Sequence, residues 1–247
     1  MFHVKHDFKK LKKFAKEKDI ILTDGMLEQM DDLCSLLLEK NKVMNLTAIE
    51  DMEQIEIKHL IDSLESVPLI KELAGEEFSL ADVGCGAGFP GIPLKIVFPK
   101  AHFTLVDSIN KRITFVEEAG SRLGLEKFEA VAARAEDIAR TEKRESFDIC
   151  VSRAVAKTNV LLEYCLPMVK TGGYCIFYKS SEPEKEIGDA QEALKVLGGR
   201  IRNTLSFELP EGGGGRSLIV VEKLSPTGEK YPRKAGRPAK RPIENIV

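Results

Sequence analysis

The chain has 247 residues, 43% of them hydrophobic and 31% charged, with a formal net charge of −2. This composition excludes a disordered chain and supports one sizeable core, and the near-neutral charge argues against a general nucleic-acid binder. No apolar run approaches the roughly 18–20 uncharged residues of a membrane helix, and residues 1–6 lack the apolar region of a secretory signal. We therefore expect a soluble, cytoplasmic protein.

The N-terminal third of the chain, residues 1–76, is predicted to be a helical region. Its apolar residues recur at the three- and four-residue spacing of helices that bury one face. The expected helices are 8–15, then 26–38 after a cap at Thr23 or Asp24, and about 55–73 with an interruption near Pro68.

Between residues 77 and 224, short apolar runs rich in β-forming residues alternate with helical stretches. Strands and helices of these lengths form an α/β fold of the Rossmann-like type, with a mostly parallel, doubly wound sheet covered on both faces. The expected strands are 79–83, 102–106, 128–132, 147–152, 174–179 and 217–221, and the expected helices are 92–98, 110–123, 159–169 and 184–197.

A late pair of strands, about 199–209 and 216–222, is joined by the glycine-rich segment 211–215. That spacing suits a hairpin, so the sheet is expected to end with an antiparallel strand. Residues 225–247 contain four prolines and dense positive charge, and they are predicted to be an extended basic tail without a core of its own.

The five cysteines are odd in number and include no C-x-x-C pair. Most lie in apolar surroundings, which is typical of small buried residues in a reducing compartment. We expect neither a disulfide nor a bound metal at Cys34, Cys85, Cys150, Cys165 and Cys175.

Positive charge is concentrated at both ends of the chain. Residues 5–18 hold seven lysines against two acids, and residues 230–241 hold six lysines or arginines and no acid. Such blocks are typical of segments that bind a polyanion, although a solvated helix face and a frayed tail have the same composition.

A glycine-rich loop directly follows the first expected strand. Gly84, Gly86 and Gly88 permit positive φ angles and let backbone N–H groups approach a ligand. Asp107, at the tip of the next strand, is placed to accept hydrogen bonds from two ribose hydroxyls. The loop therefore predicts a nucleotide-type cofactor, with a tight turn that binds nothing as the structural alternative.

Two cofactor classes fit this loop. Gly86-x-Gly88-x-x-Gly91 formally satisfies the dinucleotide fingerprint, so an NAD enzyme stays an alternative. Asp82 would repel a pyrophosphate but suits the cationic amino-acid end of S-adenosylmethionine, which favours the methyl donor. No Gly-Lys-Ser/Thr follows the glycines, which excludes a Walker A loop.

Seven motifs occur in order along nearly the whole chain: Asn45-Leu46-Thr47, Lys58-His59-x-x-Asp62-Ser63, Asp82-Val83-Gly84-x-Gly86-x-Gly88-Phe89-Pro90, Val106-Asp107-Ser108-x-Asn110-Lys111-Arg112, Arg134-Ala135-Glu136, Ser152-Arg153-Ala154-Val155-Ala156 and Tyr231-Pro232-Arg233-Lys234-x-Gly236. In these motifs the chain resembles the bacterial small-subunit ribosomal RNA guanine-N7 methyltransferases, also called the glucose-inhibited division protein B family.

The resemblance implies a Rossmann-like class I methyltransferase fold, S-adenosyl-L-methionine as donor, and N7 of a guanine in 16S rRNA as acceptor, in the small ribosomal subunit or its precursor. Glu136 has a second interpretation as a helix N-terminal acid stabilised by the helix dipole. The family's cofactor contacts fall on Gly84, Phe89, Ala135, Glu136 and Arg153, to which the loop itself adds Asp82, Gly86, Gly88 and Asp107.

Guanine N7 has a lone pair and no proton, so its methylation needs alignment and desolvation rather than a general base. In agreement, Ser152-Arg153-Ala154-Val155 replaces the Asn/Asp-Pro-Pro-aromatic tetrad common in enzymes that methylate exocyclic amines. Arg153 is expected to contact the cofactor or the guanine, with a structural salt bridge as the alternative. Lys179 is a second candidate at the reaction site, and an ordinary surface lysine fits its position as well.

The expected RNA contacts come from several segments. His59 and Asp62 lie one helical turn apart and face either the acceptor or a structural hydrogen-bond partner. Basic side chains are predicted to hold phosphates in a salt-sensitive way that reads no sequence: Lys111, Arg112, Arg233 and Lys234, with the basic ends.

Nothing in the sequence demands more than a monomer. Two other functions stay open: a small-molecule methyltransferase of the same fold, and an RNA-binding ribosome-assembly protein without activity.

Overall fold

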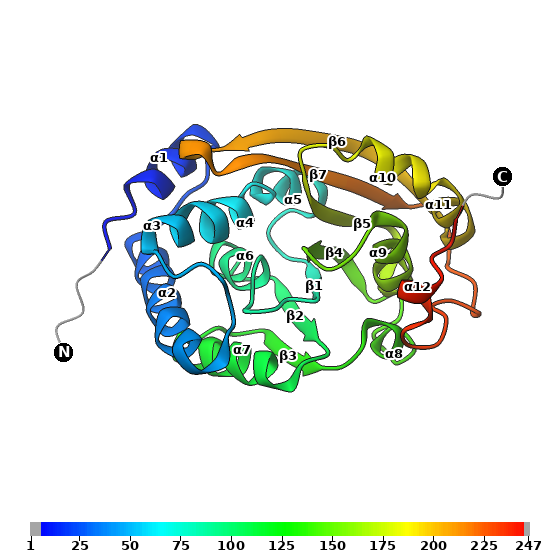
Figure 1. The fold of residues 1–247 in the computed structure, drawn as a ribbon, viewed down its shortest axis with the longest axis horizontal. Coiled ribbons are helices and arrows are strands. Elements are labelled where there is room, and N and C mark those ends of the chain that lie inside the picture. The colour runs from blue at the N-terminus through cyan, green and yellow to red at the C-terminus, as the bar shows by residue number, and fades with distance from the viewer. Residues whose placement is uncertain (1–5, 245–247) are drawn as a thin grey trace.

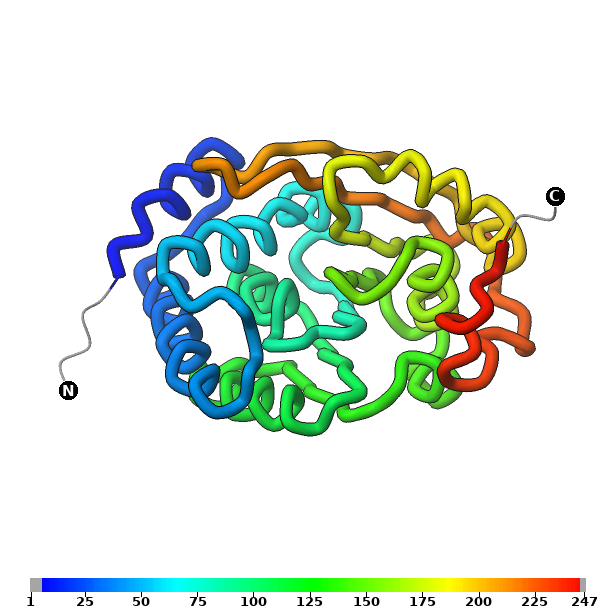
Figure 2. The backbone as a smooth tube through the Cα atoms, viewed as in Figure 1, coloured from blue at the N-terminus to red at the C-terminus, as the bar shows by residue number. Residues whose placement is uncertain are grey.

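The computed structural model describes residues 6–244. Two sequence predictions fall on residues 1–5 and so lie outside the described residues. They are the lack of a secretory signal at the start and the place of Lys5 in the N-terminal basic block. In the described part, helices surround one seven-stranded sheet (Figure 1), and the N-terminal helices and the C-terminal segment lie toward opposite ends of the long axis (Figure 2).

The sheet has the strand order β3-β2-β1-β4-β5-β7-β6. Strands β1 to β5 pair in parallel, whereas β7 pairs antiparallel with both β5 and β6. This confirms the expected doubly wound sheet with an antiparallel last strand. The strands are β1 (Ser79–Val83), β2 (His102–Asp107), β3 (Phe128–Ala132), β4 (Phe147–Arg153), β5 (Val169–Ser180), β6 (Gly199–Leu209) and β7 (Gly214–Lys223).

Helices cover both faces because successive strand residues point to opposite sides. Leu80 and Ile176 belong to the core on one face, and their neighbours Ala81 and Phe177 belong to the core on the other. The first face carries α5 (Val67–Ala74), α6 (Gly91–Val97) and α7 (Asn110–Arg122), and the second carries α8 (Ala135–Ile138), α9 (Thr158–Cys165), η2 (Leu166–Met168), α10 (Glu184–Asp189) and α11 (Gln191–Leu197).

The N-terminal helices add a layer outside the first face. Thr23 caps the longest of them through a hydrogen bond from the Met26 amide, as the sequence predicts. The third helical stretch begins at Met52 and breaks before Pro68, which lies in the first turn of α5. These helices share one hydrophobic core with the sheet: α1 (Lys9–Glu17), α2 (Asp24–Met44), α3 (Met52–Ile55), η1 (Glu56–Ile61, a π-helix) and α4 (Asp62–Leu64).

The C-terminal segment differs from the expected extended tail. It folds back onto the second face, where Thr227 and Pro238 are buried and a short helix, α12 (Arg237–Lys240), lies beside α9 (Figure 1). Arg144 donates to the carbonyl oxygens of Thr227 and Tyr231, at 2.5 and 2.8 Å. The prolines and charges of this segment suggest an unfolded tail. Hydrogen bonds from the partly buried Arg144 to its backbone carbonyls nevertheless hold the segment in place.

All five cysteines are buried, as expected for small apolar residues, and each has a free thiol. No helix in residues 6–244 combines the length and apolar character needed to cross a membrane.

Candidate active site

The loop after β1 adopts the conformation that its glycines permit. Gly84, Gly86 and Gly88 have φ angles of 73°, 57° and 84°, all in the left-handed region. A Cβ atom on Gly84 would lie 2.3 Å from Cγ2 of Val155, which comes from the loop after β4. Gly84 therefore brings the two loops at the carboxyl ends of β1 and β4 into close contact.

Asp82 lies beneath this loop. Its side chain is fully buried, and its Oδ2 accepts a hydrogen bond of 2.8 Å from the amide of Gly91, at the start of α6. Its Oδ1 is buried without a hydrogen-bond partner, and burial raises the pKa of this carboxyl to about 7. Asp82 supports the loop from below, and a direct contact with a cofactor stays a prediction.

A cavity of about 330 Å³ opens beside the loop. Asp107 lies in its wall, where Oδ2 accepts from the Gly86 amide at 3.0 Å and pairs with Arg112 at 3.2 Å. The volume falls within the roughly 300–1,000 Å³ of small-ligand sites. We call this the cofactor cavity. Its lining includes four residues predicted to bind the cofactor, Gly84, Asp107, Ala135 and Glu136, and also Arg112, which the sequence predicts to hold RNA phosphate. The predicted cofactor residues Asp82, Gly86, Gly88, Phe89 and Arg153 do not line it.

The C-terminal segment completes the cofactor cavity. Glu136 is buried and accepts a hydrogen bond of 2.7 Å from the amide of Gly236. Ala239 of α12 and Tyr164 of α9 line the same cavity. Sequence reasoning missed Tyr164 and Ala239, because neither lies in the segments that carried the cofactor motifs and only the fold brings α9 and α12 to this wall.

A second cavity, of about 600 Å³, shares a wall with the first. Ala154, Val155 and Ala156 line both cavities, and Ala154 has a positive φ of 56°. Non-glycine residues rarely adopt this conformation outside sites where the surrounding structure imposes it. We call this the acceptor cavity; the rest of its lining is Ile49, Lys58, His59, Asp62, Arg153, Tyr178, Lys179, Ser180 and Arg216.

His59 links three parts of the site. Its Nε2 lies 3.0 Å from Thr47 Oγ1, and its ring stacks on Phe89 with the centroids 4.7 Å apart. Burial and the neighbouring Arg153 guanidinium lower the pKa of His59 to about 4, so the ring is neutral at pH 7. His59 thus lines the acceptor cavity and also makes a structural hydrogen bond. The two interpretations of this residue therefore do not exclude each other.

Arg153 reaches across the acceptor cavity to the N-terminal helices. Its Nη1 donates to Asp62 Oδ2 at 2.6 Å and to the Lys58 carbonyl at 3.2 Å, and its guanidinium lies over the Phe89 ring. Arg153 therefore lies at the strand edge, as predicted, and also forms the salt bridge that the sequence left as an alternative. Both side chains of the pair are mostly buried, so loss of either would leave an unpaired charge.

Lys179 also lies in the acceptor cavity. Its Nζ pairs with Glu186 at 2.6 Å and donates to the carbonyl of Ala156 at 2.7 Å. This lysine is largely buried, which disagrees with an ordinary surface lysine. Through its bond to Ala156, Lys179 holds one end of the segment Ala154–Ala156, which lines both cavities.

Three of the predicted RNA-binding residues lie outside both cavities. Lys111 is exposed and donates to the carbonyl of Met44. Arg233 binds the buried carboxylate of Glu163, with Nη2 2.6 Å from Oε2 and Nε 2.9 Å from Oε1. Lys234 is exposed. Arg233 thus has a structural partner, while contact of these residues with RNA stays a prediction.

Solved structures share this fold at low sequence identity. The 1,6-didemethyltoxoflavin-N1-methyltransferase of Burkholderia thailandensis, with bound S-adenosylhomocysteine, is 12% identical, with a TM-score of 0.54 over 78% of this chain and 90% of that chain. TYW2 of M. jannaschii, in complex with AdoMet, is 14% identical, with a TM-score of 0.51 over 66% of this chain and 77% of that chain. These likenesses establish a class I methyltransferase fold.

Sequence relatives are much closer. Ribosomal RNA small subunit methyltransferase G of Alkaliphilus metalliredigens is 45% identical over 235 residues, which cover 95% of this chain and 98% of that protein. The protein of the same name from Staphylococcus carnosus is 47% identical over 92% of this chain and 95% of its own length. The sequence model of the family described as rRNA small subunit methyltransferase G matches residues 26–212. With matches of this extent, the chain belongs to the rRNA small subunit methyltransferase G family.

Proposed function

We propose that this protein transfers a methyl group from S-adenosyl-L-methionine to N7 of a guanine in 16S ribosomal RNA. The observation that carries the proposal is the pair of cavities with the common wall Ala154–Ala156. One cavity fits a nucleoside-type donor and the other a base, and the wall between them is where two bound molecules would meet.

The residues of the cofactor cavity suit S-adenosylmethionine. Asp107 ends β2 with an acceptor carboxylate at the cavity wall, where ribose hydroxyls can donate to it. Ala135 offers a small apolar wall for an adenine face, and Gly84 allows close backbone approach. The bound sulfonium would supply an activated methyl group.

The acceptor cavity suits an RNA base. Lys58, Arg153, Lys179 and Arg216 give it an excess of positive charge, as a phosphate-bearing substrate requires. Tyr178 and Ile49 offer apolar surface for a base. Because His59 is neutral and N7 carries no proton, these residues align and desolvate the acceptor rather than move a proton.

The remaining parts of the proposal concern setting and assembly state. We expect the protein to act as a monomer, since nothing in the sequence demands more. Five free thiols fit the reducing cytoplasm, where small ribosomal subunits assemble.

The test uses labelled S-adenosylmethionine and small ribosomal subunits from cells that lack this methyltransferase. We expect label in 16S rRNA and strand cleavage at a single N7-methylguanine. Asp107→Asn should lose the label, because the ribose-binding carboxylate is gone. Transfer to a metabolite instead of RNA, or RNA binding without transfer, would refute the proposal in favour of a small-molecule enzyme or an assembly protein.

A further inference from the structure

One carboxylate in the acceptor cavity has an unfilled hydrogen-bonding position. Asp62 is buried, and its Oδ2 is held by Arg153 at 2.6 Å. Its Oδ1 has no hydrogen-bond partner. The nearest cation on that side is Arg216 of β7, whose Nε lies 3.9 Å from Oδ1, too far for a hydrogen bond.

A structural role alone does not account for this geometry. An arginine can bind both oxygens of a carboxylate at once, yet Arg153 takes only one oxygen of Asp62 and spends another bond on the Lys58 carbonyl. A buried acceptor without a partner destabilises the protein. The free oxygen is therefore expected to have its partner in a bound molecule.

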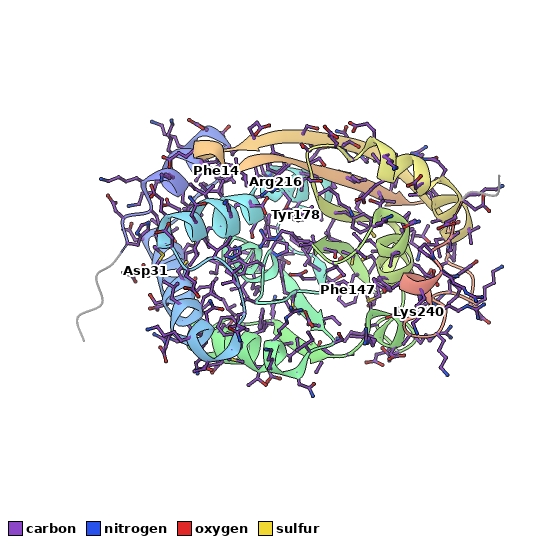
Figure 3. All side chains as sticks on the ribbon, in the orientation of Figure 1. Phe14, Asp31, Phe147, Tyr178, Arg216 and Lys240 are labelled. Atoms are coloured by element: carbon purple, nitrogen blue, oxygen red, sulfur yellow. The ribbon has the colours of Figure 1, made fainter. Side chains whose placement is uncertain are left out.

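The surroundings define what that molecule must offer. Asp62 is the one acid among the described residues that line this cavity, and an ionised carboxylate only accepts hydrogen bonds. The rest of the lining is cationic or uncharged, with Tyr178 and Arg216 on the adjacent strands β5 and β7 (Figure 3). A hydrogen-bond donor is therefore required, and in an RNA substrate the N–H groups on the edge of a base supply one.

We propose that Asp62 selects guanine by accepting hydrogen bonds from N1–H and the 2-amino group of the target base. Guanine presents two adjacent donors on its Watson–Crick edge. Adenine and cytosine have an acceptor ring nitrogen at the central position, and uracil has one donor between two carbonyls. A carboxylate consequently attracts guanine and repels the acceptor edges of the other bases. This inference rests on the proposed function.

The same contact orients and assists the reaction. With N1 and the 2-amino group at Asp62, N7 lies on the opposite side of the purine and points away from this carboxylate, which leaves it free to meet a donor bound in the neighbouring cavity. The N7 lone pair forms a bond to the methyl carbon while the carbon–sulfur bond breaks and its electrons stay on sulfur. Positive charge thereby moves onto the guanine, where it strengthens both hydrogen bonds to the carboxylate.

The experiment compares small subunits that carry guanosine or inosine at the mapped target position. Inosine lacks the 2-amino group but keeps N7, O6 and N1–H. For the wild-type enzyme we expect inosine to lower kcat/KM by about tenfold, as for a lost hydrogen bond to a charged group. Asp62→Asn should lower kcat on guanosine by roughly 10- to 100-fold and make the two substrates nearly equal.

Glu65→Gln is the matched control, because Glu65 is a neighbouring buried acid that pairs with Lys18 outside both cavities. It should keep the wild-type preference for guanosine. The affinity for S-adenosylmethionine should stay unchanged in both variants, which also reports that each is folded.

The outcomes separate the two proposals. Equal rates on guanosine and inosine with the wild-type enzyme would overturn the assignment of Asp62 even if Asp62→Asn fails to fold. An unchanged preference for guanosine in a folded Asp62→Asn would overturn it as well. No methylation of the guanosine subunits by wild-type enzyme would overturn the proposed function, and this assignment with it.

Discussion

Gly84 and Gly86 lie in the same loop but have different surroundings. Both have positive φ, whereas a Cβ atom would clash with Val155 at Gly84 and meet nothing within 4 Å at Gly86. Gly86→Ala should cost only the backbone strain, about 1–2 kcal/mol of stability. Gly84→Ala should also displace the loop between the cavities and raise the Kd for S-adenosylmethionine by tenfold or more, ~1.4 kcal/mol. Calorimetry of both variants measures this difference, and equal affinities would contradict it.

Asp82 gives the stability a defined pH dependence. Its pKa is about 7 in the folded protein against 3.8 for an unperturbed carboxyl, so between these values the folded state binds more protons than the unfolded chain. The free energy of unfolding therefore falls as pH rises toward 7. The Asp82→Asn variant has no carboxyl at this position, so its free energy of unfolding does not fall in this way. Its unfolding free energy relative to wild type should increase by about 3 kcal/mol between pH 5 and pH 8. Urea titrations at the two pH values decide the point; a constant difference would mean that the carboxylate is ionised throughout.

Candidate site residues could be predicted from the sequence where the motif itself indicates a chemical role. Asp107 and Glu136 stand at strand or helix ends that the sequence pattern locates, and both line the cofactor cavity. Arg216 and Ala239 carry no such signal, since only the tertiary fold brings them to a cavity. The free oxygen of Asp62 is a property of distances and could not be read from residue types.

At the scale of elements, the strands were predicted better than the helices. The ranges 79–83 and 128–132 agree with β1 and β3 to the residue, because both are short runs with clear ends, although β1 is buried and β3 lies at the sheet edge with no buried residue. The helix expected at 159–169 ends at Cys165, since Pro167 lies in a 3-10 turn and β5 begins at Val169. The four-residue helices α8 and α12 are too short to produce a periodic pattern.

The contact between the C-terminal segment and α9 leads to a prediction about cofactor binding. Arg233→Ala would leave the carboxylate of Glu163 buried and unpaired, which should lower stability by about 3–5 kcal/mol. It should also release Gly236 from Glu136 and raise the Kd for S-adenosylmethionine by roughly tenfold. The exposed neighbour provides the control, because Lys234→Ala should change neither quantity. Wild-type affinity in a folded Arg233→Ala variant would show that the segment is dispensable for the cofactor cavity.

For the molecule as a whole, the two basic segments do not form one patch. Phe14 of α1 and Lys240 of α12 lie on opposite sides of the molecule along its long axis (Figure 3). The N-terminal lysines mostly face acids: Lys9 and Lys12 pair with Asp7, and Lys13 with Glu17. By contrast, the exposed C-terminal cations Lys234, Lys240 and Arg241 form no ion pair with any described residue.

This asymmetry predicts which end binds RNA phosphates. Changing Lys234, Lys240 and Arg241 to glutamine should weaken RNA binding and reduce the slope of log K against log salt by about 0.7 for each lost contact. The matched change of Lys9, Lys12 and Lys13 should have a smaller effect, because Asp7 and Glu17 offset part of their charge. Filter binding between 50 and 200 mM salt, about the range over which such contacts are lost, measures both slopes. Equal slopes for the two variants would contradict the prediction.

The walls of the cofactor cavity come from distant parts of the chain, from Gly84 through Glu136 to Ala239. A ribosome makes a protein from its N-terminus, and folding can follow synthesis in that order. The sheet is complete in sequence at Lys223, but the cavity gains its last wall only when residue 239 has emerged. A chain that stopped after Lys223 would therefore have every strand of the sheet but lack the wall of the cofactor cavity that α12 supplies.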